Sequence, residues 1–280
     1  MKSILLPTDF SENSWNAIEY ILNFFSNTSC TFYLLHVNPL TEVAINNIDY
    51  NVSQTLIEDV FTKPAKKQLT VLLKKIARYF PNNPKHSFYT INTTDFFIDA
   101  VRNQVTEKKI DLIVMGTKGA SGLEKLIIGS NTADIITKVK CNTLIVPENA
   151  KFKTLSQIAF PTDFLQFYGV TTLKPIVEIL ENFEASLRVL HITKKDIKLN
   201  SDQEKNKEFL EDYFTNNNHS FHYLTNTKIE AAIQCFVESR NIDMIAMVAK
   251  NLNYFQQILF HSKVEEISYQ TDVPFLVLHE

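Results

Sequence analysis

Glycine is scarce in this sequence. Its 280 residues include five glycines, where an average usage of about 7% would give about twenty. So little glycine excludes collagen, glycine-serine linkers and low-complexity disorder. Four of the five lie close together at Gly116, Gly119, Gly122 and Gly129, and the fifth is Gly169. The cluster predicts one place at which the backbone needs the freedom that only glycine gives.

The sequence also lacks a basic excess, a long apolar run and a cysteine framework. A net charge of -3 and a pI near 6.2 give no footprint for nucleic acid. No apolar run approaches the roughly 18 residues of a membrane span, and the apolar stretch within residues 1–7 is too short for a signal peptide. Three distant cysteines, Cys30, Cys141 and Cys235, predict reduced, partly buried thiols in a cytoplasmic protein rather than disulfides or a zinc site.

What the sequence does contain is a repeat of itself. Four segments of the first half return in the same order in the second half. The pairs are 4–10 with 158–164, 34–37 with 189–192, 110–115 with 242–247 and, more loosely, 143–148 with 274–280. This period is far longer than a solenoid repeat and is the size of a small domain. We therefore expect two tandem domains, residues 1–149 and 154–280, with the second copy shorter.

Each copy alternates short apolar runs with helical patterns. Ile18, Ile21, Leu22 and Phe25 have the i, i+3, i+4, i+7 spacing of one buried helix face, and residues 176–183 repeat it. The apolar runs are short and continuous, as in strands that are covered on both faces. This alternation predicts an α/β fold with two tandem, doubly wound, Rossmann-like parallel sheets, each with five strands and four main helices.

The carboxyl ends of the strands are the expected place for a ligand, at the point where the strand order switches. In the first copy these ends lead into Asp9, Val37 and Gly116, and a further stretch leads to Gly129 and Ser130 at a helix start. Glycines allow positive φ and a close approach of a ligand, and the N–H groups of a helix start attract an anion. Such a phosphate cradle matches neither the Walker motif nor the dinucleotide fingerprint. The alternative is an ordinary β–α connection with a glycine turn and a serine N-cap.

The spacing Gly116-x2-Gly119-x9-Gly129-Ser130 resembles the nucleotide-binding signature of the universal stress protein family. The resemblance covers the whole chain as two tandem domains, more weakly over the second. It implies a fold like that of the adenine nucleotide alpha hydrolases and one ATP, with magnesium as its companion ion, in the first domain. By position, the resemblance implies Pro7, Thr8 and Asp9 beside the ribose or adenine, Val37 at the adenine edge, Met115 and Gly116 beneath it, and Gly119, Gly129, Ser130, Asn131 and Thr132 at the phosphates.

The second copy departs from this signature. Ser262 is kept, and the three glycine positions hold Val248, Asn251 and His261. Valine resists positive φ and these side chains would crowd a phosphate, so we predict that the second copy does not bind ATP. Asp163 persists nevertheless, which indicates a structural, capping role. The same role, as a cap of the following helix, is an alternative for Asp9.

Three further features have predictions of their own. His36 and His191 recur at one strand position without partners at ligand spacing, so we expect satisfied, partly buried histidines and no metal site. Residues 38–53 are a long asparagine-rich connection, either a lid over the nucleotide or plain surface disorder. The last strands, 143–146 and 274–278, are expected to meet in an intramolecular pseudo-dimer, as the resemblance implies, because an exposed apolar edge needs cover. Pairing of whole chains stays open.

Three functions are compatible with these observations. The resemblance favours a regulatory ATP-binding protein, not an enzyme, whose second domain is structural or contacts protein partners, and no nucleic acid or membrane is expected as a partner. A slow ATPase or phosphoryl-accepting enzyme is the second, with Ser130 or Thr132 as the acceptor, although no general base is placed near the phosphates. An interaction scaffold that binds no nucleotide is the third.

Overall fold

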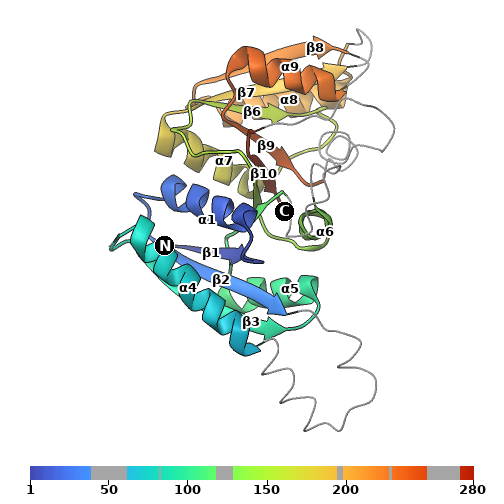
Figure 1. Ribbon diagram of the computed structural model, residues 1–280. Coiled ribbons are helices and arrows are strands. Elements are labelled where there is room, and N and C mark those ends of the chain that lie inside the picture. The colour runs from blue at the N-terminus through green and yellow to red at the C-terminus, as the bar shows by residue number, and fades with distance from the viewer. Residues whose placement is uncertain (39–61, 82, 118–128, 194–197, 227–228, 251–271) are drawn as a thin grey trace.

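A computed structural model describes residues 1–38, 62–81, 83–117, 129–193, 198–226, 229–250 and 272–280 (Figure 1). The strands of the first half are β1 (Lys2–Pro7), β2 (Cys30–Asn38), β3 (His86–Thr94), β4 (Leu112–Gly116) and β5 (Thr143–Val146). Those of the second half are β6 (Gln157–Pro161), β7 (Ser186–Thr193), β8 (His219–Thr225), β9 (Met244–Val248) and β10 (Phe275–Leu278). The helices are α1 (Glu12–Phe24), α4 (Lys63–Tyr79), α5 (Phe97–Lys108), α6 (Ser130–Lys138), α7 (Val170–Phe183), α8 (Ser201–Tyr213) and α9 (Ile229–Arg240).

The ten strands form one continuous sheet in the order β3-β2-β1-β4-β5-β10-β9-β6-β7-β8. All pairs within each half are parallel, and the pair that joins the halves, β5 with β10, is antiparallel. The predicted doubly wound parallel arrangement is confirmed in each half. The predicted meeting of the last strands is confirmed as well, and it merges the two five-stranded sheets into one.

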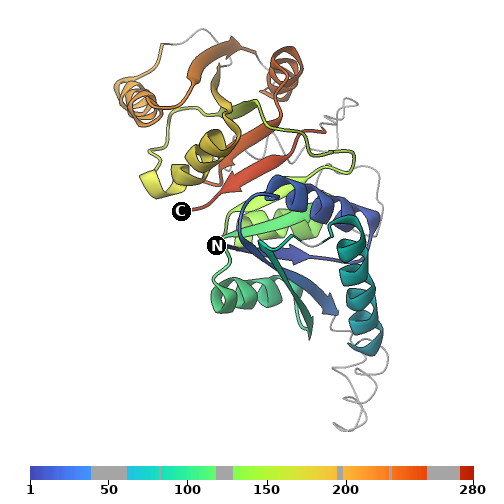
Figure 2. The same cartoon turned by 90° about the vertical axis from the view of Figure 1, so that its left-hand side faces the viewer.

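Helices cover both faces of this sheet (Figure 2). Side chains alternate along a strand, so Ile4 and Leu6 pack with α1 and α4 in one buried cluster, whereas Leu5 packs with α5 and α6 in another. In the second half α7 and α8 cover the face that α1 and α4 cover in the first, and α9 covers the opposite face. The fourth helix expected of the second copy falls at 251–271, outside the described residues.

Polar and aromatic contacts reinforce the seam between the halves. The buried amide of Asn16 donates to the carbonyls of Pro147 and Ala150, at 3.0 Å each, and the rings of Phe24 and Phe183 lie 5.0 Å apart. Buried polar groups need partners, so Asn16 links α1 to the connection between the halves. Within the described ranges, no helix combines the length and apolarity that crossing a bilayer requires.

Candidate functional site

The switch in strand order of the first half lies between β1 and β4. Strand β1 pairs with β2 on one side and with β4 on the other. The strand order therefore reverses here, at the edge where a ligand was expected from the sequence. Hydrogen bonds join the segments around this edge. The His36 ring donates from Nδ1 to the Thr8 carbonyl at 2.8 Å, and the Thr132 hydroxyl donates to the Gly116 carbonyl at 3.0 Å.

Gly116 is required by the close approach of a helix. A Cβ at this position would lie 3.0 Å from the carbonyl oxygen of Asn13, in the first turn of α1. Its φ lies outside the left-handed region, so the expectation that Gly116 serves a positive φ is wrong. The first turn of α1 therefore rests directly on the end of β4, which fixes the floor of the edge.

The start of α6 lies beside this floor. Its N-cap is Gly129, with φ -65° and ψ 155°, and no side chain caps the helix, so the alternative of a serine N-cap is wrong. The first-turn N–H groups of a helix have no intrahelical partner, and Ser130 and Asn131 are exposed. An uncapped, exposed helix start of this kind suits an anion.

The two ends of the glycine segment are held together. The Gly129 N–H donates to the Thr117 carbonyl, and Thr132, 3% exposed, commits its hydroxyl hydrogen to Gly116. That hydroxyl cannot donate to a phosphate while this bond exists. The backbone N–H of Thr132 is a separate donor and can still donate to one. Gly119 and Gly122, like the 38–53 connection beyond Asn38, lie outside the described residues.

Asp9 closes the turn between β1 and α1. Its Oδ1 accepts from the backbone N–H of Ser11 at 3.0 Å and from the Ser11 hydroxyl at 2.6 Å. Ser11 is the N-cap of α1 and accepts from the Ser14 N–H. The alternative in which Asp9 itself caps the helix is therefore wrong in detail, since Asp9 orients the cap. The carboxylate is exposed at the edge where the resemblance implies the ribose or adenine.

The family now follows from comparison with known proteins. The sequence pattern of the universal stress protein family matches residues 1–147. The chain belongs to the universal stress protein family.

Individual relatives agree with this assignment. A universal stress protein of Methanocaldococcus jannaschii is 27% identical over 154 residues, which are 54% of this chain and 84% of the relative. Universal stress protein A homolog 1 of Coxiella burnetii is 29% identical over 149 residues, 52% of this chain and 95% of the relative. The crystal structure of a universal stress protein from Archaeoglobus fulgidus has the same fold over both halves. It has a TM-score of 0.70 at 19% identity, and the match covers 98% of this chain and 97% of that one.

The second half of this universal stress protein repeats the β1–α1 turn. Asp163 Oδ1 accepts from the Leu165 N–H at 3.0 Å, and His191 Nδ1 donates to the Thr162 carbonyl at 2.9 Å. The residue after each aspartate is left-handed, with φ 63° at Phe10 and 58° at Phe164. The turn thus recurs, with its strained residue, in the half that lacks the glycine signature. This recurrence gives Asp163 the structural role expected of it.

The second half differs where the first half keeps Gly116. Val248 takes that position and is 2% exposed. Helix α7 begins at Val170, capped by Gly169, four residues or about one turn later than the alignment with α1 would place it. The helical turn that requires Gly116 is therefore absent, and Val248 has room. Asn251, His261 and Ser262 lie outside the described residues.

The remaining titratable groups offer little chemistry. Burial is the main cause that raises the pKa of the Cys30 thiol to about 11 and that of Cys141 to about 12, so neither forms a thiolate near neutral pH; Cys235 is exposed. Among the residues that the structure places, no three His, Cys, Asp or Glu side chains gather as a metal ion would need. His36 is hydrogen-bonded as expected. His191 is bonded through Nδ1, but its Nε2 has no partner among the described residues, so the expectation of a satisfied histidine is met there at one nitrogen of two.

Proposed function

We propose that this universal stress protein is a regulatory ATP-binding protein with one nucleotide site, at the switch between β1 and β4 of the first half. The observation that carries the proposal is the start of α6. There an uncapped, exposed helix N-terminus adjoins the end of β4, and the intact glycine signature frames it. The α6 macrodipole and its free N–H groups favour a phosphate at that position.

The nucleotide is arranged along this edge in the proposal. Gly129, Ser130 and Asn131 hold the phosphates, together with Gly119 and the backbone N–H of Thr132. Asp9 accepts from ribose hydroxyls, because its residue is exposed at this edge and a carboxylate is an acceptor for hydroxyl groups. The walls and floor of the site are Pro7, Thr8, Val37, Met115 and Gly116. Magnesium accompanies the phosphates.

The two halves have different tasks in this proposal. Residues 1–149 form the nucleotide-binding domain, and residues 154–280 form a domain that supports the fold or contacts protein partners. The shared sheet gives each domain cover for its edge strand. The protein acts in the cytoplasm as a binding protein rather than as an enzyme.

Calorimetry with ATP tests the proposal. We expect one ATP per chain, and mass analysis should find adenine nucleotide released from protein purified without added nucleotide. Two equal sites per chain would contradict the assignment of the site to the first half. A protein that neither carries nor takes up ATP would instead be an interaction scaffold.

A turnover assay separates binding from catalysis. We expect ATP hydrolysis at background in the native protein and in Ser130→Ala alike, because no sequence motif places a general base near the phosphates. Hydrolysis well above background that disappears in Ser130→Ala would identify an enzyme.

A further inference from the structure

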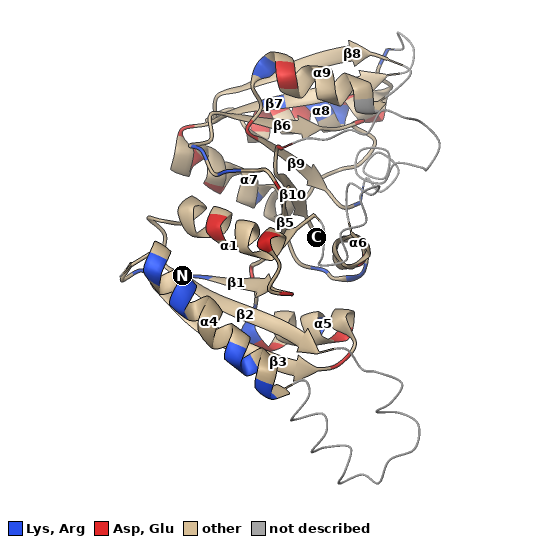
Figure 3. Cartoon of the chain, in the orientation of Figure 1, with Lys and Arg blue, Asp and Glu red and all other residues tan. Residues whose placement is uncertain are grey.

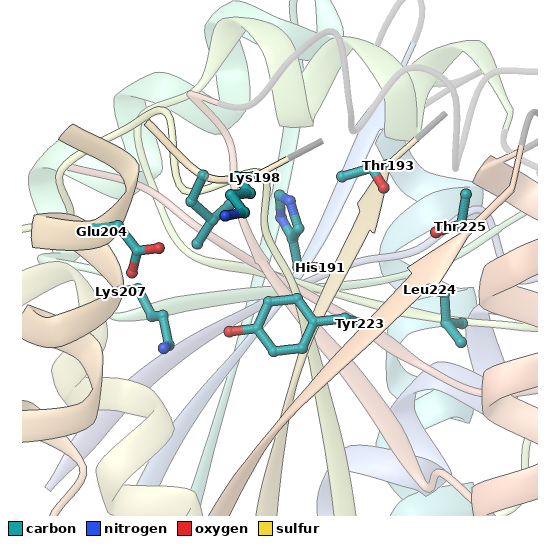
Figure 4. Close-up of a pocket in the computed structure, with 9 residues that line it drawn as sticks. His191, Thr193, Lys198, Glu204, Lys207, Tyr223, Leu224 and Thr225 are labelled. Carbon is teal, nitrogen blue, oxygen red and sulfur yellow. The ribbon is translucent and has the colours of Figure 1, made fainter. Parts of the chain in front are cut away.

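A hollow of about 220 Å³ lies in the second half, over the carboxyl ends of β7 and β8 (Figure 4). Seven polar side chains line it from β7, β8, α8 and the segment before α8. They are His191, Thr193, Lys198, Glu204, Lys207, Tyr223 and Thr225. The hollow is separate from the switch point of this half, because β6 stands between β7 and β9 in the sheet. It adjoins β7, the counterpart of β2, but its lining includes none of the second-half counterparts of the residues proposed to bind nucleotide.

His191 has a ring nitrogen that no described residue pairs. The ring is 4% exposed, and its Nδ1 must carry the hydrogen because its partner, the Thr162 carbonyl, can only accept. His191 lines the hollow, and its other ring nitrogen, Nε2, is a buried acceptor that has no partner among the described residues. A buried acceptor without a partner costs free energy, so a hydrogen-bond donor is the missing component.

A lysine reaches the same hollow from an acidic helix. Helix α8 carries five acidic residues and two lysines, and both signs are visible on it in Figure 3. Lys205 pairs with Asp202 on the exposed face at 3.7 Å. Lys207 instead lies over the ring of Phe221, with Nζ 5.9 Å from its centroid, and lines the hollow with Lys198. Two lysines against Glu204 give the lining one net positive charge.

The equivalent place in the first half is lined by amide side chains that are hydrogen-bonded. Strand register puts Tyr223 beside His191 and Asn92 beside His36. Asn38 donates to the Asn92 side chain at 2.9 Å, and Asn92 donates to the Thr62 carbonyl at 3.2 Å. Short amides thus satisfy one another in the first half, whereas the second half sets an aromatic wall and lysines around an unpaired nitrogen.

We propose that this hollow binds a small phosphate monoester that carries a hydroxyl group. Lysine ammonium groups bind phosphate as point charges, and no arginine fork for a planar carboxylate lines the hollow. The ligand hydroxyl donates to His191 Nε2, and Glu204 accepts from a second hydroxyl. The volume lies below the roughly 300–1,000 Å³ of drug-sized sites, which favours a ligand smaller than a nucleotide.

Nuclear magnetic resonance of the full chain with labelled histidine tests this, with glycerol 3-phosphate as the probe. We expect a saturable shift of the His191 Nε2 signal, identified by its loss in His191→Gln. Lys207→Gln should lower the affinity for the probe at least about tenfold, since a charge-assisted hydrogen bond is lost. Lys205→Gln is the matched control: it removes the same charge from the same helix outside the hollow, and should change affinity less than twofold.

Several outcomes would overturn the proposal. One is the absence of a saturable shift in the native protein, which would leave an ordered water as the partner of His191. If Lys207→Gln and Lys205→Gln weaken binding of the probe equally, the probe responds to the overall charge of α8 and not to a site in the hollow. Glycerol or inorganic phosphate binding as tightly as the ester would exclude a hydroxylated phosphate ester as the ligand. Because the signal belongs to His191, the result does not depend on whether the first half binds ATP.

Discussion

The two halves of this protein share the turn after their first strand and differ in almost everything beside it. Both keep Thr-Asp-Phe with a left-handed phenylalanine and a histidine that donates to the threonine carbonyl. Around that turn the first half has an uncapped helix start beside Gly116, and the second half has Val248 and a hollow over β7 and β8. The shared turn serves the fold in both halves, and the residues that differ beside it mark where the two proposed ligands differ. Four tests sharpen this comparison.

Gly129→Val should have the largest effect. We expect ATP affinity to fall by about 100-fold, because the side chain blocks the seat at which at least two charge-assisted bonds of about 1.5–3 kcal/mol each would form. Calorimetry measures the loss. Gly169→Val is the control, since Gly169 caps α7 with nearly the same backbone, φ -67° and ψ 147°, and its ATP affinity should stay native. Unchanged ATP affinity in Gly129→Val would contradict the proposal that phosphates bind at Gly129.

Val248→Gly tests whether the second half can be returned to the pattern of the first. We expect a loss of about 2–4 kcal/mol in the free energy of unfolding, because a buried side chain is removed and no helical turn fills the space. Urea denaturation measures it. The stoichiometry of ATP should remain one per chain. If this variant bound a second nucleotide, Val248 alone would account for the lack of a nucleotide site in the second half.

Gly116→Ala tests the helix contact of the first half. The new Cβ meets the Asn13 carbonyl at 3.0 Å, so we expect destabilisation of about 1–3 kcal/mol from overpacking. Gly169→Ala is the control, because its Cβ finds its nearest neighbour at 3.7 Å. Equal unfolding free energies for the two variants would show that α1 does not press on β4.

Asp9→Asn and Asp163→Asn should have the smallest effects. The amide oxygen can still accept from the N–H two residues on, so each variant should lose no more than about 0.5 kcal/mol of stability. Asp9→Asn should in addition weaken ATP up to about tenfold, because a charged acceptor for the ribose is lost. If both variants bind ATP like the native protein, Asp9 is a turn residue only.

Much of the fold could be predicted from sequence patterns. The helix stripe through Ile18 and Leu22 and the short apolar strands depend on local periodicity, and the repeat set their order. The site was predicted less completely. Gly116 was placed at the correct edge for the wrong reason, because only the packing of α1 shows that a helix requires it. Thr132 was predicted as a phosphate donor from its position, and only the structure shows where its hydroxyl points.

The sequence by itself determined that the chain is a duplicated α/β protein, that the edge proposed for its ligand follows the first and fourth strands, and that one half keeps the glycine signature. These features are local or periodic, so they can be read from neighbouring residues. Only the tertiary structure decided that β5 and β10 merge two sheets into one, that α7 begins a turn late so that Val248 fits, and that His191 lines a hollow with a ring nitrogen that no described residue pairs. These depend on contacts between residues far apart in the chain, which no local pattern encodes.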